Sequence, residues 1–203
     1  MTAVKMCGLC RAEDIAAVNE LRPEYVGFVF APGSRRRISA ETAEKLRRTL
    51  APEIRAVGVF TDARIGEAAA LLEAGIIDMA QLHGGEDEAY IAALRARTGR
   101  PVIRAFRVRG EADIRAARAS SADHILLDAG AGEGRVFDWG LLRGMDRPYF
   151  LAGGLNPENV SRAVRELRPF AVDVSSGIER DGRKDKEKMR AFIRAVREET
   201  GKA

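Results

Sequence analysis

Residues 54–82 read IRAVGVFTDARIGEAAALLEAGIIDMAQL, and this stretch contains the pattern that decides the fold. Two apolar runs, Ile54–Phe60 and Met79–Leu82, enclose a segment whose apolar residues recur at helical spacing. Asp62 is placed to cap that helix at its start, and Gly75 to end it. The stretch therefore predicts a strand, a helix and a second strand that runs parallel to the first.

The same alternation runs through the whole chain of 203 residues. Eight apolar runs predict eight strands: Val4–Cys7, Tyr25–Phe30, Ile54–Phe60, Met79–Leu82, Val102–Phe106, His124–Leu127, Tyr149–Ala152 and Ala171–Ser175. They are apolar at both odd and even positions, as parallel strands buried on two faces should be. Helical stretches separate most of them, although the interval before Tyr149 offers at most a short helix over 139–143.

This pattern predicts an α/β fold, a single-domain (β/α)8 TIM barrel over residues 1–203. A doubly wound open sheet is the alternative, but eight parallel strands in so short a chain favour closure. Ser39 is placed to cap a further helix, and Asn156 precedes a proline at the start of another.

The composition is that of an ordinary globular domain, with 46% hydrophobic and 32% charged residues. Two cysteines cannot form the disulfide framework of a small secreted protein. No signal peptide is visible at the N-terminus, and no window approaches the roughly 20 apolar residues that a membrane helix needs. We therefore expect a cytoplasmic protein without membrane contact.

The net charge of +4 raises the question of nucleic-acid binding. Basic residues are interspersed with acidic ones, and Arg35–Arg37 is the one basic triplet. A nucleic-acid site would need a basic stripe with interleaved aromatic residues, which the sequence lacks. We expect a solvated charged surface and no nucleic-acid partner.

Polar, small and reactive residues cluster where the predicted strands end. The carboxyl ends of barrel strands carry the active site in this architecture. In chain order, these ends and the residues after them are Cys7–Cys10, Phe30–Arg36, Phe60–Asp62, Gln81–Gly84, Phe106–Arg107, Leu127–Asp128, Ala152–Asn156 and Val174–Gly177. The sequence therefore predicts a functional site at one mouth of the barrel.

The last two of these segments favour a phosphate site. Gly153–Gly154 precede Asn156. Ser175 ends the last predicted strand, and Ser176 and Gly177 follow it in a turn. Both offer backbone N–H groups near helix starts, and barrels often bind phosphate after strands seven and eight. The alternative is a pair of tight turns that require glycine.

Cys7 and Cys10 allow three interpretations. Their spacing after a strand is typical of a thioredoxin-like redox pair. A zinc site would need a second ligand pair, and His83 and His124 do not have the matching spacing. In the third interpretation Cys7 is a working thiol and Cys10 is incidental, while a buried inert cysteine is the alternative for either residue.

Three more side chains are candidates for the site. Asp128 ends the sixth predicted strand, where a carboxylate could act as a general acid or base, or could simply form a turn. His83 could bind a ligand or cap a loop, whereas His124 begins a strand and is expected to be structural. Arg36 could grip a carboxylate with two N–H groups, or be one of three solvated arginines. The glycines of residues 130–134 are not a dinucleotide fingerprint, because their spacing is one residue short and the motif belongs after a first strand.

Nine segments together carry a family resemblance: Lys5–Leu9, Val26–Phe30, Arg36, Val57–Phe60, Gln81–Gly84, Leu126–Asp128, Phe137–Trp139, Ala152–Val160 and Asp173–Glu179. With these segments the chain resembles the phosphoribosylanthranilate isomerase family of tryptophan biosynthesis over essentially its whole length. Each segment is short, but together and in this order they are very specific.

The resemblance implies an Amadori rearrangement, in which N-(5-phosphoribosyl)anthranilate opens its furanose ring and becomes 1-(o-carboxyphenylamino)-1-deoxyribulose 5-phosphate. By the family pattern Asp128 is the acid that protonates the ring oxygen, and Cys7 is the base that removes the C2′ proton of the resulting Schiff base. A free thiol has a pKa of about 8.5, so Cys7 needs help to become a thiolate near neutral pH. The proton moves within the substrate, so no redox cofactor and no metal is expected.

The resemblance also implies residues that bind the substrate or support the site. The binding set is Arg36 for the anthranilate carboxylate, with His83, Gly154, Asn156, Ser176 and Gly177, and the supporting set is Lys5, Gln81 and Asp173. Lys5 could favour the Cys7 thiolate from the same strand face, or could pair with Asp173 in a structural layer. The expected partner is the small-molecule substrate, and the chain is expected to be a monomer or a homodimer.

The chain departs from the family pattern at two places. Cys10 stands where the family usually has Thr, and the loop after the sixth strand is cut to Gly132–Val136, with an acid where the family has a hydroxyl. The first departure predicts that oxidation captures Cys7 in a disulfide with Cys10, unless the two Cβ atoms point apart. Two other functions remain alternatives: the related histidine-pathway aminoaldose isomerase, which resembles a duplicated half-barrel with aspartates as acid and base, and a C-x-x-C redox protein.

Overall fold

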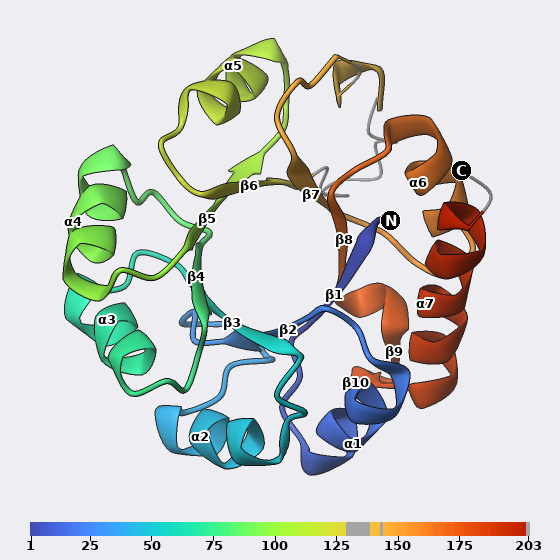
Figure 1. The fold of residues 1–203 in the computed structure, drawn as a ribbon, viewed down its shortest axis with the longest axis horizontal. Coiled ribbons are helices and arrows are strands. Elements are labelled where there is room, and N and C mark those ends of the chain that lie inside the picture. The colour runs from blue at the N-terminus through green and yellow to red at the C-terminus, as the bar shows by residue number, and fades with distance from the viewer. Residues whose placement is uncertain (129–138, 143, 202–203) are drawn as a thin grey trace.

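Eight parallel strands form a closed barrel, and helices surround it (Figure 1). The computed structural model describes residues 1–128, 139–142 and 144–201. In chain order the strands are β1 (Ala3–Cys7), β2 (Tyr25–Val29), β3 (Arg55–Phe60), β4 (Met79–Leu82), β5 (Val102–Arg107), β6 (His124–Asp128), β7 (Tyr149–Ala152) and β8 (Ala171–Val174). Each strand pairs with the next, and β8 closes the ring on β1. The predicted barrel is confirmed, with every strand end within one residue of its expected place.

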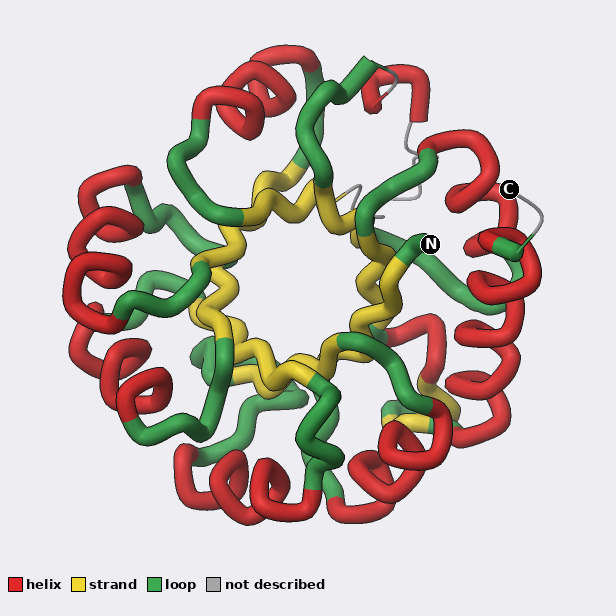
Figure 2. Tube along the Cα trace, in the orientation of Figure 1, coloured by secondary structure: helices red, strands yellow, loops and turns green. Residues whose placement is uncertain are grey.

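The helices lie outside the ring of strands (Figure 2). They are α1 (Ala12–Leu21), α2 (Ala40–Thr49), α3 (Ile65–Glu73), α4 (Glu88–Thr98), α5 (Glu111–Ala119), α6 (Val160–Leu167) and α7 (Lys186–Thr200). Before β7, the described residues contain the short 3-10 helix η1 (Trp139–Leu142), in agreement with the short helix expected there.

A small hairpin follows β8. The 3-10 turn η2 (Ser176–Ile178) leads into two antiparallel strands, β9 (Glu179–Arg180) and β10 (Arg183–Lys184). The sequence does not predict this hairpin, because strands of two residues show no periodicity.

The local capping signals are right at α2 and wrong at the start of α3. Ser39 caps α2 with its hydroxyl, and Gly75 follows α3 with a φ of 68°. Asp62 does not cap α3, whose N-cap is Arg64. Its carboxylate instead accepts a hydrogen bond from the backbone N–H of Gly85 at 2.6 Å, because the loops after β3 and β4 lie side by side in the ring.

The strand side chains alternate between two apolar regions. Val4 and Met6 of β1 face outward and pack under the helices. Inward-facing side chains fill the barrel, among them Tyr25, Val57, Met79, Ile103, Leu126 and Phe150. The alternation places Lys5 and Cys7 of β1 on the inward side. Inward-facing side chains at the carboxyl ends of the strands therefore face the mouth of the barrel that is expected to carry the site.

In the part of the chain that the structure describes, no helix is long and apolar enough to cross a membrane. The glycine run 130–134 and the shortened loop 132–136 lie outside the described residues. What the sequence predicts for these two segments stays a prediction.

Candidate active site

The strands bring the predicted residues to one rim of the barrel. Cys7, Gln81 and Asp128 lie near the carboxyl ends of β1, β4 and β6, and each is on the inward side of its strand. Because all eight strands are parallel, these ends and the loops that follow them share the same mouth. Arg36 and His83 stand in the loops after β2 and β4, and the two glycine loops follow β7 and β8.

Cys7 is a buried thiol at the top of the barrel interior. It is 8% exposed and packs with Val29 and Val59. Burial raises the pKa of the Cys7 thiol, whereas the ammonium groups of Lys5 and Lys184 lower it, and the net shift is upward. Lys5 therefore lowers the pKa of Cys7 as expected, and Lys184 lowers it further, but the effect of burial is larger than both together.

Lys5 and Asp173 form an ion pair inside the barrel. Nζ of Lys5 donates to Oδ1 of Asp173 at 2.9 Å, and the lysine side chain is fully buried. Burial lowers the pKa of Lys5, but the nearby Asp173 and Cys7 raise it above its ordinary value. Both interpretations of Lys5 therefore apply: it pairs with Asp173, and its charge acts on Cys7.

A row of three polar side chains ends on Asp128. Nε2 of His83 lies 3.3 Å from Oδ2 of Asp128, and Nε2 of Gln81 lies 3.1 Å from Nδ1 of His83. An amide nitrogen can only donate, so Nδ1 of His83 accepts from Gln81, and the imidazole proton lies on Nε2, the atom nearest to the Asp128 carboxylate. His83 therefore lies directly beside the predicted acid. The sequence alone does not predict this contact.

The two glycine loops pack against each other. A Cβ atom on Gly177 would collide with the backbone oxygen of Leu155, so the loop after β8 touches the loop after β7. Oδ1 of Asn156 accepts two backbone N–H groups of the turn before α6. Asn156 is not the helix cap that the sequence predicts, because α6 begins at Val160 and its N-cap is Asn159. Among the described residues, the N–H groups of Gly154, Ser176 and Gly177 make no hydrogen bond. They are therefore available to an anion such as phosphate.

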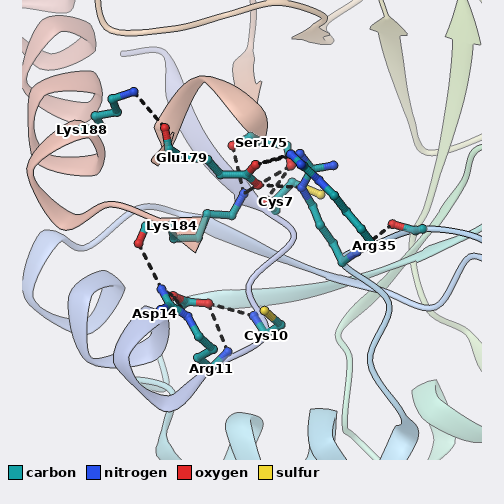
Figure 3. A network of polar contacts seen from close by, with 11 residues as sticks. Cys7, Cys10, Arg11, Asp14, Arg35, Ser175, Glu179, Lys184 and Lys188 are labelled. Carbon is teal, nitrogen blue, oxygen red and sulfur yellow. Dashed lines mark hydrogen bonds and ion pairs between the residues drawn. The ribbon is translucent and has the colours of Figure 1, made fainter. Parts of the chain in front are cut away.

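Arg36 is already bound to a carboxylate of the chain. Its Nε and Nη2 donate to Oε1 and Oε2 of Glu179 at 2.6 and 3.0 Å. Oε1 of Glu179 also accepts from Nζ of Lys184 at 2.8 Å (Figure 3). Sequence reasoning missed Glu179 and Lys184 as site residues. The signal was available for Glu179, which ends one of the segments that carry the family resemblance.

The C-x-x-C pair is split between two environments. Cys7 faces the barrel interior, whereas Cys10 is exposed and its backbone N–H donates to Asp14 at the start of α1. Both thiols are free, and this placement favours the geometry in which the two side chains point apart. Within the described ranges, no group of three His, Cys, Asp or Glu side chains could hold a metal ion.

Comparison with known proteins identifies the family. Residues 4–195 match the family described as N-(5'phosphoribosyl)anthranilate (PRA) isomerase. This chain belongs to the PRA isomerase family. The PRA isomerase of Endomicrobium trichonymphae is 44% identical over 202 residues, which cover 97% of this chain and 99% of that one. That of Acetivibrio thermocellus is 43% identical over 215 residues, with 99% and 98% covered.

Solved structures of PRA isomerases have the same fold as this chain. The enzyme from Thermotoga maritima superposes with a TM-score of 0.88 at 37% identity, covering 98% of this chain and 100% of that one. A PRA isomerase in complex with reduced 1-(o-carboxyphenylamino)-1-deoxyribulose 5-phosphate gives a TM-score of 0.87, with the same identity and coverage. A further structure describes the Thermotoga maritima enzyme as dimeric. The PRA isomerase predicted from the sequence is confirmed, in place of the aminoaldose isomerase and the redox protein.

Proposed function

We propose that this chain converts N-(5′-phosphoribosyl)anthranilate into 1-(o-carboxyphenylamino)-1-deoxyribulose 5-phosphate, with Asp128 as the acid and Cys7 as the base. The observation that carries the proposal is the shared inward face of β1 and β6 at one mouth. Between these strands in the ring lie β7 and β8, whose loops offer free N–H groups to a phosphate. A substrate anchored there by its phosphate reaches both side chains. The related enzyme that binds a reduced form of this product supports the ligand class.

The proton movements follow from these two groups. Protonated Asp128 gives its proton to the ring oxygen as the C1′–O bond breaks, and the nitrogen lone pair forms the C=N bond of a cationic Schiff base. The Cys7 thiolate removes the C2′ proton, whose electron pair forms a C1′=C2′ bond and neutralises the nitrogen. The resulting enol becomes the ketone when C1′ gains a proton and the C2′ hydroxyl loses one.

Charge near Cys7 explains how a buried thiol serves as the base. Lys5 and Lys184 lower its pKa but do not overcome burial. The Schiff base formed in the first step adds a positive charge beside the thiol, which favours the thiolate at the step that needs it. His83 holds the Asp128 carboxyl through Nε2 and so fixes the direction from which the ring oxygen is protonated.

The remaining groups bind the two anionic ends of the substrate. Arg36 holds the anthranilate carboxylate, and the N–H groups of Gly154, Ser176 and Gly177 hold the phosphate. The biosynthetic role of the family supports a cytoplasmic location, and a monomer or a homodimer remains the proposed assembly.

Replacement of the acid and the base tests the mechanism. Cys7→Ala and Asp128→Asn should each lower kcat by at least about 10²-fold, because each removes a proton-transfer group. Turnover is followed by the loss of substrate fluorescence, and circular dichroism checks that both variants are folded. Near-normal kcat in a folded variant would remove that residue from the mechanism.

Replacement of Arg36 tests how the substrate is bound. Arg36→Met should raise KM strongly, because a paired carboxylate contact is lost. Inorganic phosphate should inhibit competitively through the two glycine loops. A crystal soaked in sulfate that shows the anion elsewhere, with these loops empty, would contradict the phosphate assignment.

A further inference from the structure

Glu179 is the point on which three cations near the mouth converge. Its Oε1 accepts from Nε of Arg36 at 2.6 Å and from Nζ of Lys184 at 2.8 Å. Its Oε2 accepts from Nη2 of Arg36 at 3.0 Å and from Nη2 of Arg35 at 2.6 Å. Burial raises the pKa of this carboxyl, but the bonds from Arg36 and Lys184 lower it to about 2. Glu179 is therefore ionised throughout the working pH range, with its acceptor positions filled.

The contact with Glu179 uses one edge of the Arg36 guanidinium. Nε and Nη2 form this edge, and both donate to the carboxylate. The other bidentate edge consists of Nη1 and the second N–H of Nη2. Among the described residues, Nη1 of Arg36 makes no hydrogen bond. A planar guanidinium binds carboxylates edge to edge, so Arg36 has one such edge occupied and one free.

The stem of Arg36 is held in place by the loop after β1. Gly8 has a φ of 80°, and a Cβ atom at this position would collide with Cδ of Arg36. The arginine stem therefore lies directly across the residue that follows Cys7. This close approach fixes the stem, while Glu179 fixes the guanidinium.

Glu179 is itself anchored to the end of β1. The hairpin pairs Glu179 with Lys184, whose side chain is only 2% exposed and also donates to the backbone oxygen of Ser175 at 2.9 Å. The Ser175 hydroxyl in turn donates to the backbone oxygen of Cys7 at 3.1 Å. Lys188 of α7 adds a bond to the backbone oxygen of Glu179 (Figure 3). The carboxylate thus has a defined position relative to the thiol.

We propose that Glu179 is a positioning residue for substrate recognition, which holds Arg36 by its Nε edge and directs the free Nη1 edge to the substrate carboxylate. The inference rests on the proposed function, in which Arg36 binds the anthranilate carboxylate. A free arginine loses side-chain entropy when a ligand orders it, whereas Arg36 is ordered before the substrate binds. The surplus of cations over the single carboxylate leaves the cluster net positive, so a second carboxylate is still attracted.

Two substitutions at Glu179 test this role. Glu179→Gln keeps the side-chain length but offers Arg36 one acceptor oxygen, and Glu179→Asp keeps the charge but is one methylene too short for both N–H groups. Each should raise KM about tenfold with kcat within about twofold of wild type. This result is expected when the lost contact stabilises the bound substrate and the transition state equally. Either variant suffices if the other does not fold.

A matched pair elsewhere on the molecule serves as the control. Glu73 on α3 accepts from Nε and Nη2 of Arg97 at 2.8 and 3.1 Å, which is the same edge-on geometry on an exposed surface. Glu73→Gln should leave KM unchanged. The Ki of inorganic phosphate, measured as a competitive inhibitor, should stay constant in both Glu179 variants because the glycine loops are untouched.

A double variant separates positioning from other roles. If Glu179 acts through Arg36, Glu179→Gln should change KM less than about twofold in an Arg36→Met background. An unchanged or lowered KM in the Glu179 variants, beside a raised KM in Arg36→Met, would overturn the positioning role and leave the proposed function intact. A phosphate Ki that rises together with KM would also overturn it, since the effect would then come from a displaced loop. An unchanged KM in Arg36→Met would refute the binding role of Arg36, and the positioning role with it.

Discussion

Gly27 lies beside the proposed base, and Gly27→Ala tests whether Cys7 needs its observed position. Cys7 and Gly27 are partners in the register of β1 and β2. A Cβ atom on Gly27 would lie 2.6 Å from Sγ of Cys7 and 3.0 Å from its Cα. Ordinary contact begins near 3.4 Å, so the sulfur must move by about 1 Å, a displacement that is large on the scale of catalytic geometry.

This displacement sets the size of the expected effect. A misplacement of about 1 Å costs on the order of 10²-fold in rate, so kcat should fall by about that factor. Overpacking against the Cys7 backbone should lower the free energy of unfolding by about 1–3 kcal/mol. Gly27 is not among the residues with positive φ, so backbone strain does not contribute.

The assay follows kcat by the loss of substrate fluorescence and the free energy of unfolding by urea denaturation. Gly110→Ala is the matched control, because a Cβ there meets nothing within 4 Å and its φ of −179° suits any residue. It should leave kcat unchanged. A folded Gly27→Ala enzyme with kcat within about twofold of wild type would refute the reasoning, because the thiol would then tolerate displacement.

Three further outcomes are expected. Lys5→Met should lower the free energy of unfolding by about 3–5 kcal/mol in urea denaturation, because it removes one partner of a buried ion pair; a loss below about 1 kcal/mol would contradict this. The stability difference between wild type and Glu179→Gln should be full above pH 4.5 and should disappear as the pH falls toward 2, because the carboxyl has a pKa of about 2 when folded against an ordinary 4.5. Urea titrations at several pH values check this, and a difference that does not vary with pH would contradict it. Cys10→Thr should keep full activity, and mild oxidation of wild type should leave both thiols titratable; a reversible Cys7–Cys10 disulfide in mass analysis would instead establish a redox switch.

The fold was predictable from local pattern because each βα unit repeats the same short-range requirements. Runs that are apolar at both odd and even positions, as in Ile54–Phe60, indicate strands buried on two faces. Eight such strands in a short chain favour a closed ring. The prediction at Asp62 was wrong because the contact that decides its role is not local. Its carboxylate instead accepts from the N–H of Gly85, which lies on the next loop of the ring. The residues next to Asp62 in the sequence do not indicate this contact.

The candidate site was predictable in its composition but not in its contacts. Cys7 and Asp128 stand at strand ends and Arg36 in a loop that follows a strand, and parallel strands bring such ends and loops together. The contact of His83 with Asp128 depends on the register around the barrel, which no spacing along the chain encodes.

The sequence by itself determined the barrel and the family, because periodicity, strand order and short motifs act over neighbouring residues. It also predicted the mouth of the barrel for the site, and the family resemblance implied the acid and the base. Only the tertiary structure decided which charges meet: Arg36 binds Glu179 across 143 positions, and Lys5 binds Asp173 across 168. Ion pairs form between groups that the closed ring brings within about 3 Å, and that proximity exists only once β8 has paired with β1.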